Sequence, residues 1–194
     1  MAVLTRVRAT GLLVRCAAAV ACSLAPAGRA SAQAPPGGLE YRVKAAYLLN
    51  FTRYVEWPPS VFLEPDAPLN LCVVGRDPFG DVLDRTVAGR RAAGRRLRVL
   101  RPERPAGDAC HVAFIGQTTD AVREAWLVAL KEAQTLTVGE GAAFAEAGGM
   151  IGFVIVGETV RFEINVEAVS AGGLRISSRV LTLATRLYPQ RGTP

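Results

Sequence analysis

Three short apolar runs constrain the fold of this chain more than any other feature of its sequence. The runs Leu69 to Val74, Cys110 to Ile115 and Met150 to Val156 are each typical of a β-strand. Helical segments, Asp81 to Val87 and Ala121 to Glu132, follow the first two runs. Strands that alternate with helices in this way predict an α/β domain with a mostly parallel sheet.

The remaining segments complete a single domain over residues 39–188. Further strands are expected at Arg95 to Leu100, Thr135 to Val138 and Thr159 to Asn165. Gly157 and Glu158 fit a two-residue hairpin turn, so the last of these strands should run antiparallel to the one before it. A final helix is expected from Ser177 to Leu187. The sequence therefore predicts a mixed, mostly parallel sheet flanked by helices, with a C-terminal antiparallel hairpin.

The helix expected from Leu39 to about Trp57 places its apolar side chains on one face. That face carries Val43, Tyr47, Phe51 and Tyr54. Asn50 projects into the middle of this face, so its amide should need a buried partner. Lys44 should lie outside the stripe.

Residues 1–32 have the pattern of a secretory signal peptide. Arg6 and Arg8 form a basic segment, an apolar segment follows, and Ala30-Ser31-Ala32 is a small-x-small cleavage motif. Cleavage is expected between Ala32 and Gln33, followed by a linker over 33–38, the domain over 39–188 and a tail over 189–194. The apolar run is shorter than the ~20 residues that span a bilayer, which argues against a retained anchor. Lipidation at Cys22 remains an alternative.

The formal charge of +6 belongs mainly to this leader. Four of the 23 basic residues and none of the 17 acidic residues lie in residues 1–32, which leaves 19 basic against 17 acidic residues in the rest. A nearly neutral domain gives no electrostatic case for binding nucleic acid.

Export changes the interpretation of the cysteines. Two of the four cysteines leave with the leader, and the mature chain keeps Cys72 and Cys110. An even number of cysteines in an oxidising compartment favours one disulfide. Two separate buried thiols are the alternative.

No catalytic, cofactor-binding or metal-binding residues emerge from the sequence. The single histidine, His111, is adjacent to Cys110, and neighbours on a strand point to opposite faces, so a Cys–His nucleophile pair is not expected. The segment from Gly75 to Gly80 occupies the position of a phosphate loop but lacks the glycine-rich signatures of one. It is interpreted as a strand–helix turn.

Two polar surfaces remain as candidates for binding. An arginine cluster consists of Arg90, Arg91, Arg95, Arg96, Arg98, Arg101 and Arg104. It is either an anion-binding patch or a solvated loop and edge strand whose charges block edge-to-edge aggregation. On the strand from Thr159, the side chains of Arg161, Glu163 and Asn165 share one face, which is either a recognition surface or an ordinary outward face.

Read together, several motifs resemble the YfiR family of periplasmic proteins over Leu39 to about Tyr188. The motifs, in order, are Tyr47-Leu48-Leu49-Asn50-Phe51, Val55-Glu56-Trp57-Pro58, Leu71-Cys72-Val73-Val74-Gly75, Cys110-His111-Val112-Ala113-Phe114-Ile115, Leu136-Thr137-Val138, Gly148-Gly149-Met150-Ile151, Arg161-Phe162-Glu163-Ile164-Asn165 and Leu174-Arg175-Ile176-Ser177-Ser178-Arg179. Each motif alone is weak, but the ordered set is specific.

The resemblance implies a repressor and not an enzyme. Proteins of this family bind the periplasmic sensor region of an inner-membrane diguanylate cyclase and hold it inactive, and an outer-membrane lipoprotein can sequester them. Members tend to form homodimers and carry disulfides, and the family pattern supports the pairing of Cys72 with Cys110. Because they share one strand face, Arg161, Glu163 and Asn165 are expected to form the partner-binding surface. A periplasmic small-molecule-binding protein, with a crevice at the strand ends, is the alternative function.

Overall fold

Helices and strands alternate along the part of the chain that the computed structural model describes, residues 38–104 and 110–189. In chain order the elements are α1 (Gly38–Tyr54), β1 (Val55–Glu56), a 3-10 helix (Pro59–Val61), β2 (Leu69–Val74), α2 (Asp81–Val87), β3 (Arg91–Ala92), β4 (Arg95–Leu100), β5 (Val112–Ile115), α3 (Asp120–Glu132), β6 (Leu136–Glu140), α4 (Ala142–Glu146), β7 (Ile151–Val156), β8 (Thr159–Asn165), α5 (Val166–Ala171), β9 (Arg175–Ile176), α6 (Ser178–Leu181) and β10 (Arg186–Tyr188). The predicted leader and its cleavage site at Ala32 and Gln33 lie outside the described residues. None of the helices within these ranges is long and apolar enough to cross a membrane.

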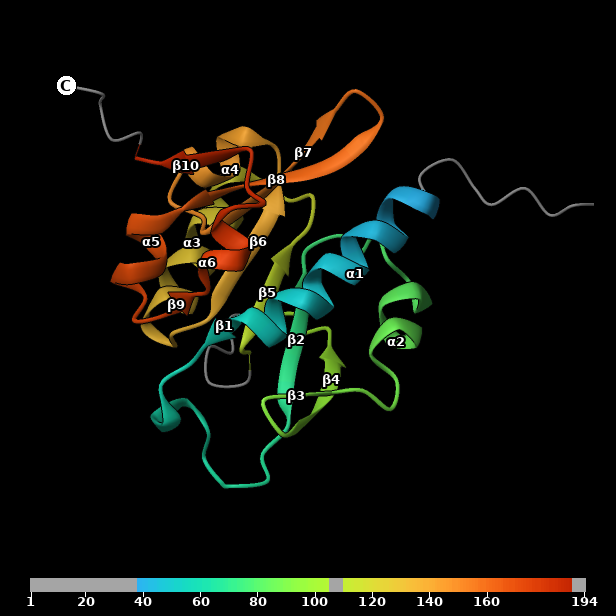
Figure 1. Ribbon diagram of the computed structural model, residues 1–194, viewed down its shortest axis with the longest axis vertical. Helices are drawn as coiled ribbons and strands as arrows, with labels where there is room; N and C mark the ends of the chain where they lie inside the picture. The colour runs from blue at the N-terminus through green and yellow to red at the C-terminus, as the bar shows by residue number, and fades with distance from the viewer. Residues whose placement is uncertain (1–37, 105–109, 190–194) are drawn as a thin grey trace, which may run out of the picture. The chain divides into compact units, whose positions relative to one another are not determined.

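The strands form a mixed sheet of eight strands in the order β10-β8-β7-β6-β5-β2-β4-β3 (Figure 1). From β7 to β4 all neighbours are parallel, and β10 is parallel to β8. Within this sheet of the described residues, the antiparallel pairs are the β7–β8 hairpin and the β3–β4 pair. The predicted fold class, a mixed and mostly parallel sheet with a C-terminal hairpin, is confirmed.

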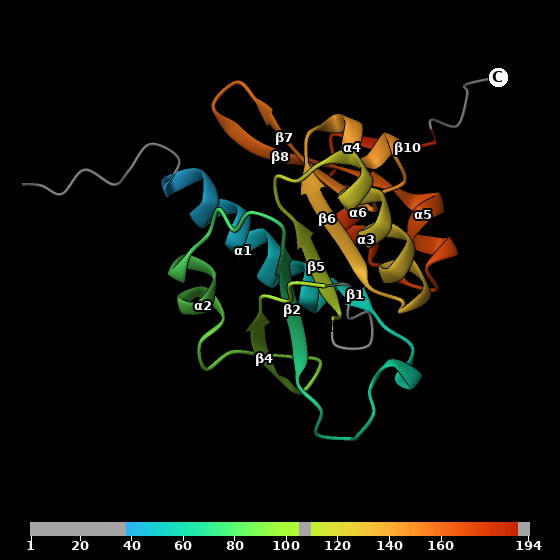
Figure 2. The same ribbon diagram turned by 180° about the vertical axis from the view of Figure 1, so that it is seen from behind.

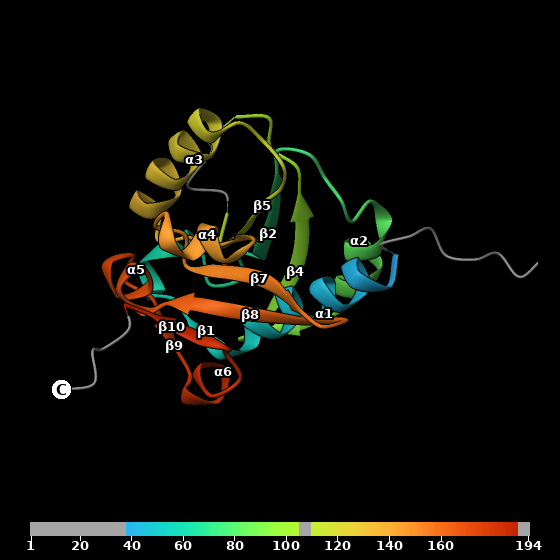
Figure 3. The ribbon, with the colours of Figure 1, turned by 90° about the horizontal axis from the view of Figure 1, so that it is seen from above.

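Helices cover both faces of this sheet. Seen from above, α1 and α6 lie on one side, and α3 and α4 lie on the other (Figure 3). The view from behind shows α3 in front of the strands (Figure 2). Alternate residues of β2 serve the two sides, since Leu71 and Val73 join the larger apolar cluster under α1 while Cys72 and Val74 join the smaller cluster under α3.

The buried face of α1 is wider than the predicted one. Phe51 is buried, and Val43, Tyr47 and Tyr54 pack against the larger apolar cluster, as the prediction requires. Ala45, Leu48, Leu49 and Thr52 are buried beside them. Asn50 is exposed, so the expectation of a buried partner for its amide is wrong. Lys44 was expected outside the core and is only 3% exposed, because two carboxylates flank its ammonium group.

The end of the domain also differs from the prediction. The expected helix from Ser177 to Leu187 stops after the single turn of α6, and the chain then extends into β10, which pairs with β8. Thr185 begins this pairing by donating its backbone N–H to the carbonyl oxygen of Phe162 at 2.9 Å. The edge of β8 that faces away from β7 supplies the backbone groups with which β10 pairs. The local sequence of residues 177–187 gives no sign of this pairing.

A disulfide joins Cys72 of β2 to Cys110, which precedes β5. The two Cα atoms are 5.7 Å apart, and the cysteines are 38 residues apart in sequence. Both cysteines are buried in the apolar cluster under α3, beside Trp126 and Leu130. The disulfide therefore links β2 to the segment just before β5, and it lies within the smaller apolar cluster.

Replacing both cysteines by alanine should lower the free energy of unfolding by about 4 kcal/mol, because the disulfide closes a long loop in the unfolded chain. Guanidinium chloride unfolding of the double variant and of the oxidised protein measures this difference. Oxidised protein treated with a reductant serves as the control and should unfold near the denaturant concentration of the double variant. Equal midpoints for the variant and the oxidised protein would contradict the prediction.

Candidate functional site

The order of the strands reverses at β2, and this reversal opens a cleft. From β2 the chain passes through α2 to β4 on one side, whereas β5 occupies the other side and continues into α3. α2 packs beside α1, and α3 lies on the opposite side of the sheet (Figure 3). In parallel α/β sheets, ligands bind outside the carboxyl ends of strands at such a reversal.

A cavity of about 960 Å³ lies at this point. Its walls are residues 76–82, which follow β2, residues 115–118 at and after the end of β5, residue 140 at the end of β6, and residues 143 and 144 of α4. Gly38 and Tyr41 of α1 and Arg123 of α3 complete it. We call this cavity the switch-point cleft. Its volume is at the upper end of the roughly 300–1,000 Å³ typical of small-molecule sites.

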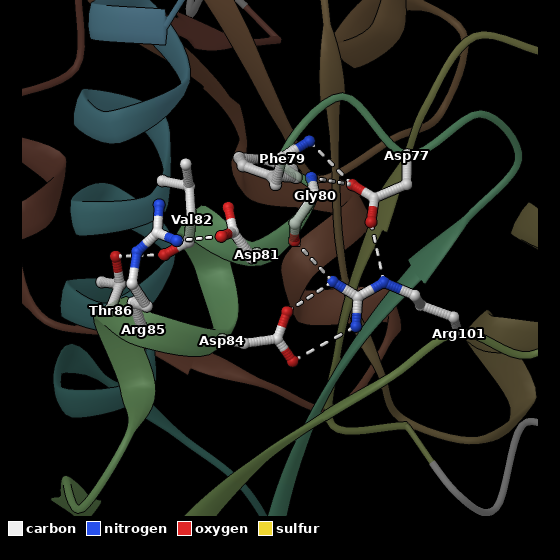
Figure 4. A network of polar contacts seen from close by, with 9 residues as sticks. All are labelled: Asp77, Phe79, Gly80, Asp81, Val82, Asp84, Arg85, Thr86 and Arg101. Carbon is white, nitrogen blue, oxygen red and sulfur yellow. Dashed lines mark hydrogen bonds and ion pairs between the residues drawn. The ribbon is translucent and has the colours of Figure 1, made fainter.

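The turn after β2 forms one wall of the switch-point cleft and is held by Asp77 and Arg101 (Figure 4). Asp77 Oδ1 accepts hydrogen bonds from the backbone N–H groups of Phe79, at 2.7 Å, and Gly80, at 3.2 Å. These donors would serve a phosphate in a phosphate-binding loop, and here the chain's own carboxylate occupies them. The interpretation of this segment as a strand–helix turn agrees with these bonds.

Arg101, just after β4, ties this turn to α2. Its Nε lies 2.7 Å from Asp77 Oδ2, and its Nη2 donates to the Gly80 carbonyl at 2.7 Å and to Asp84 Oδ2 at 2.6 Å. The hydrogen bonds from Arg101 lower the pKa of the Asp84 carboxyl, and those carboxylates raise the pKa of Arg101. The guanidinium of Arg101 thus joins the segment after β4 to the turn after β2 and to α2, and so holds this wall of the cleft in place.

On the opposite wall, Lys44 joins α1 to the end of β6. Its ammonium group is 2.6 Å from Glu140 Oε1 and also bonds to Glu40. Burial alone would lower the pKa of Lys44, but the hydrogen bonds and charges of Glu140 and Glu40 together raise it. Burial, followed by the charge of Glu140, raises the pKa of Tyr41.

Arg76 stands at the mouth of the cleft beside Gln117. Its backbone N–H donates to the Gln117 carbonyl at 3.2 Å, and its Nη1 lies 3.4 Å from Gln117 Oε1. A Cβ atom on Gly116 would come within 2.0 Å of the Arg76 carbonyl oxygen, so only glycine allows this approach of the two loops. Sequence reasoning missed Arg76 and Gln117, although both closely follow the carboxyl end of a buried strand.

The three residues predicted to bind a partner lie on β8 and differ in exposure. Arg161 is exposed, whereas Glu163 is only 8% exposed. The hydroxyl of Tyr188 on β10 lies 2.8 Å from Glu163 Oε2. Asn165 caps α5, since its Oδ1 accepts the Ala168 N–H at 2.8 Å, and its Nδ2 donates to the Ala145 carbonyl at 2.8 Å.

Exposed apolar side chains accompany Arg161 on the hairpin. Residues paired directly across antiparallel strands share a face, and Arg161 is opposite Val154, while Thr159 is opposite Val156. Val156 is 55% exposed, and Val154 is half-buried. We call Val154, Val156 and Arg161 the hairpin face.

Most of the arginine cluster follows one edge of the sheet. Arg91 of β3 lies directly opposite Arg96 of β4, and like charges at such opposite positions destabilise the pairing of these two strands. Arg90, Arg96 and Arg98 are exposed, and within the described ranges none of them forms an ion pair. Arg95 instead donates to the carbonyls of Glu64 and Ala67, and Arg101 belongs to the network described above.

His111 is built into the structure at the amino-terminal side of β5. It is 5% exposed, its Nδ1 accepts the Asn70 N–H at 3.1 Å, and its ring stacks on Phe62 at 4.6 Å. Burial, with the positive charge of Arg95, lowers the pKa of His111 to about 4. This imidazole lies among structural partners and does not line the switch-point cleft.

A family model described as YfiR/HmsC-like matches residues 41–185. The match begins in α1 and ends just before β10, so it includes the switch-point cleft and the hairpin face. The chain belongs to the YfiR/HmsC-like family. This is a regulatory family and not a catalytic one, connected with the periplasmic control of diguanylate cyclase signalling.

Two solved structures are similar to part of the chain. One is described as the ABC domain in complex with L-Trp from Streptococcus pneumoniae, with 11% identity and a TM-score of 0.46 over 61% of this chain and 55% of that chain. The other is a conserved domain protein from Vibrio cholerae O1 biovar eltor, with 18% identity and a TM-score of 0.44 over 61% of this chain and 54% of that chain. The chain spans little more than half the length of either structure.

The stability of the protein should fall as the pH is lowered from 6.5 towards 4, because His111 has a pKa of about 4 when folded and 6.5 when unfolded. Between these values the unfolded state binds more protons, so the loss approaches about 1.4 kcal/mol per pH unit. His111→Gln keeps an acceptor for the Asn70 N–H and should flatten this dependence between pH 6.5 and 5. Urea unfolding at each pH gives both slopes, and identical slopes would contradict the prediction.

Proposed function

We propose that this chain is an exported periplasmic binding protein that represses an inner-membrane diguanylate cyclase by binding its periplasmic sensor region. The observation that carries the proposal is the YfiR/HmsC-like family match over residues 41–185. In this proposal the protein acts without catalysing a reaction, and its leader is removed between Ala32 and Gln33.

Repression follows from linkage. A protein that binds only the inactive state of a cyclase shifts the cyclase towards that state. A shift from mostly active to mostly inactive needs on the order of 5 kcal/mol of differential affinity. An interface of about 800 Å² on each partner is large enough to supply it.

We place this interface at the hairpin face. Arginine is enriched at the centres of protein interfaces, and the exposed apolar side chains beside it add surface that binding would bury. Val156 and Arg161 project from paired strands, which hold them without a loss of backbone entropy on binding. Glu163 and Asn165 lie further along the same strand face, where Glu163 is held by Tyr188 and Asn165 caps α5. Arg161 is therefore the predicted partner-binding residue most open to a partner.

Two further partners belong to the proposal. An outer-membrane lipoprotein that binds the same regulator would lower its free concentration and release the cyclase by mass action. A second copy of the chain would form a homodimer. Both are parts of the proposal and extend the same mechanism.

Arg161→Glu combined with Val156→Asp should raise cellular cyclic di-GMP, because the pair removes the basic and the apolar contact of the hairpin face. Loss of one central interface contact of about 2 kcal/mol weakens binding about thirtyfold. Both side chains are exposed, so the fold should remain intact. Mass spectrometry of nucleotide extracts from cells that carry the variant measures the effect.

Arg98→Glu is the matched control, since Arg98 is an exposed arginine on β4, several strands away from β8. It makes the same charge reversal as Arg161→Glu and should leave cyclic di-GMP at the wild-type level. Immunoblots must show equal periplasmic amounts of all three proteins. Wild-type repression by the double variant at equal abundance would refute the hairpin face as the interface.

A further inference from the structure

The switch-point cleft contains one positive charge without a partner. The other charged side chains that line it form ion pairs: Asp77 with Arg101, Asp81 with Arg85, Glu140 with Lys44, and Arg123 with Asp120. Arg76 alone forms no ion pair within the described ranges, and its Nη1 contacts only the neutral amide of Gln117 at 3.4 Å. An anion that enters the cleft can therefore bind Arg76 without breaking an existing ion pair.

The backbone at Arg76 is held before any ligand arrives. The backbone bridge from Arg76 to Gln117 joins the loops after β2 and β5, and the two loops approach so closely that a Cβ atom on Gly116 would clash with the Arg76 carbonyl oxygen. The turn that follows Arg76 is fastened by Arg101 through Asp77 and Gly80. A cation on such a support binds with little loss of backbone freedom.

The cleft also has an apolar wall. Phe79 and Phe144, which are 3% and 5% exposed, line it together with the half-buried ring of Tyr41. Phe79 is held by edge-on contacts with Tyr41, at 5.5 Å, and Phe114, at 4.8 Å, between ring centroids. A rigid aromatic wall beside one unpaired cation suits a ligand with an apolar body and an acidic group.

The neighbouring carboxylates limit the charge of that ligand. Glu140 and Asp81 line the same cleft, so a second anionic group on the ligand would approach a negative charge and not a free cation. A single free cation matches a single anionic group.

We propose that the switch-point cleft binds a small organic monoanion, whose acidic group contacts the Arg76 guanidinium and whose apolar body packs on Phe79 and Phe144. This site is separate from the hairpin face and does not depend on the repressor function. It makes the protein a receptor for a periplasmic small molecule.

Calorimetric titration of the purified, disulfide-bonded protein tests the site. The probes are 1-naphthylacetate, phenylacetate and hexanoate, together with 1-naphthylacetamide, the uncharged match of the first. At least one carboxylate should bind, and for naphthylacetate the amide should bind about tenfold more weakly or worse, since hydrogen bonds to charged groups are roughly twice as strong as neutral ones. Arg76→Gln should weaken carboxylate binding to a similar extent.

Arg98→Gln is the matched control, because it removes an exposed arginine outside the cleft and should bind the carboxylates as the wild type does. Arg76 is exposed, and an unchanged thermal melt of Arg76→Gln separates loss of the site from loss of the fold. The proposal is overturned if none of the three carboxylates binds at millimolar concentration, if the amide binds as tightly as its acid, or if Arg76→Gln binds like the wild type. No cyclase is present in these titrations, so their failure leaves the repressor proposal standing.

Discussion

β2 lies between β4 and β5 with both faces buried, and this position determines much of the remaining structure. Because its side chains alternate between two apolar clusters, helices must cover both sides of the sheet. Because its two neighbours follow it in sequence on opposite sides, the chain continues from β2 and from β5 into helices on opposite sides of the sheet. The cleft, the arginine that lines it and the cysteine bridge beneath α3 are all consequences of this one strand placement.

The fold was largely predictable where burial is periodic along the chain. The predicted limits of β2, β4, β8 and α2 agree with the structure because each segment carries its own pattern and turn residues. β10 could not be predicted, since its pairing depends on the free edge of β8. The environment of Lys44 was hidden for a similar reason, because Glu140 is 96 residues away in sequence.

The site was less predictable than the fold. Alternation grouped Arg161, Glu163 and Asn165 on one face of β8, but it could not show that Tyr188 would cover Glu163. The importance of Arg76 follows from the ion pairs of the other charged residues that line the cleft, and two of these pairs, Asp77 with Arg101 and Glu140 with Lys44, join residues far apart in sequence. Strand ends in a predicted parallel sheet are the one signal in the sequence that could have indicated this position.

The arginines that face one another across β3 and β4 bear on the colloidal behaviour of the protein. A second copy that tried to extend the sheet at this edge would bring further like charges beside Arg91 and Arg96. The range of that repulsion shrinks from about 30 Å in 0.01 M salt to about 3 Å in 1 M salt. Solutions of the protein at low ionic strength are therefore protected against growth at this edge, and concentrated salt removes that protection.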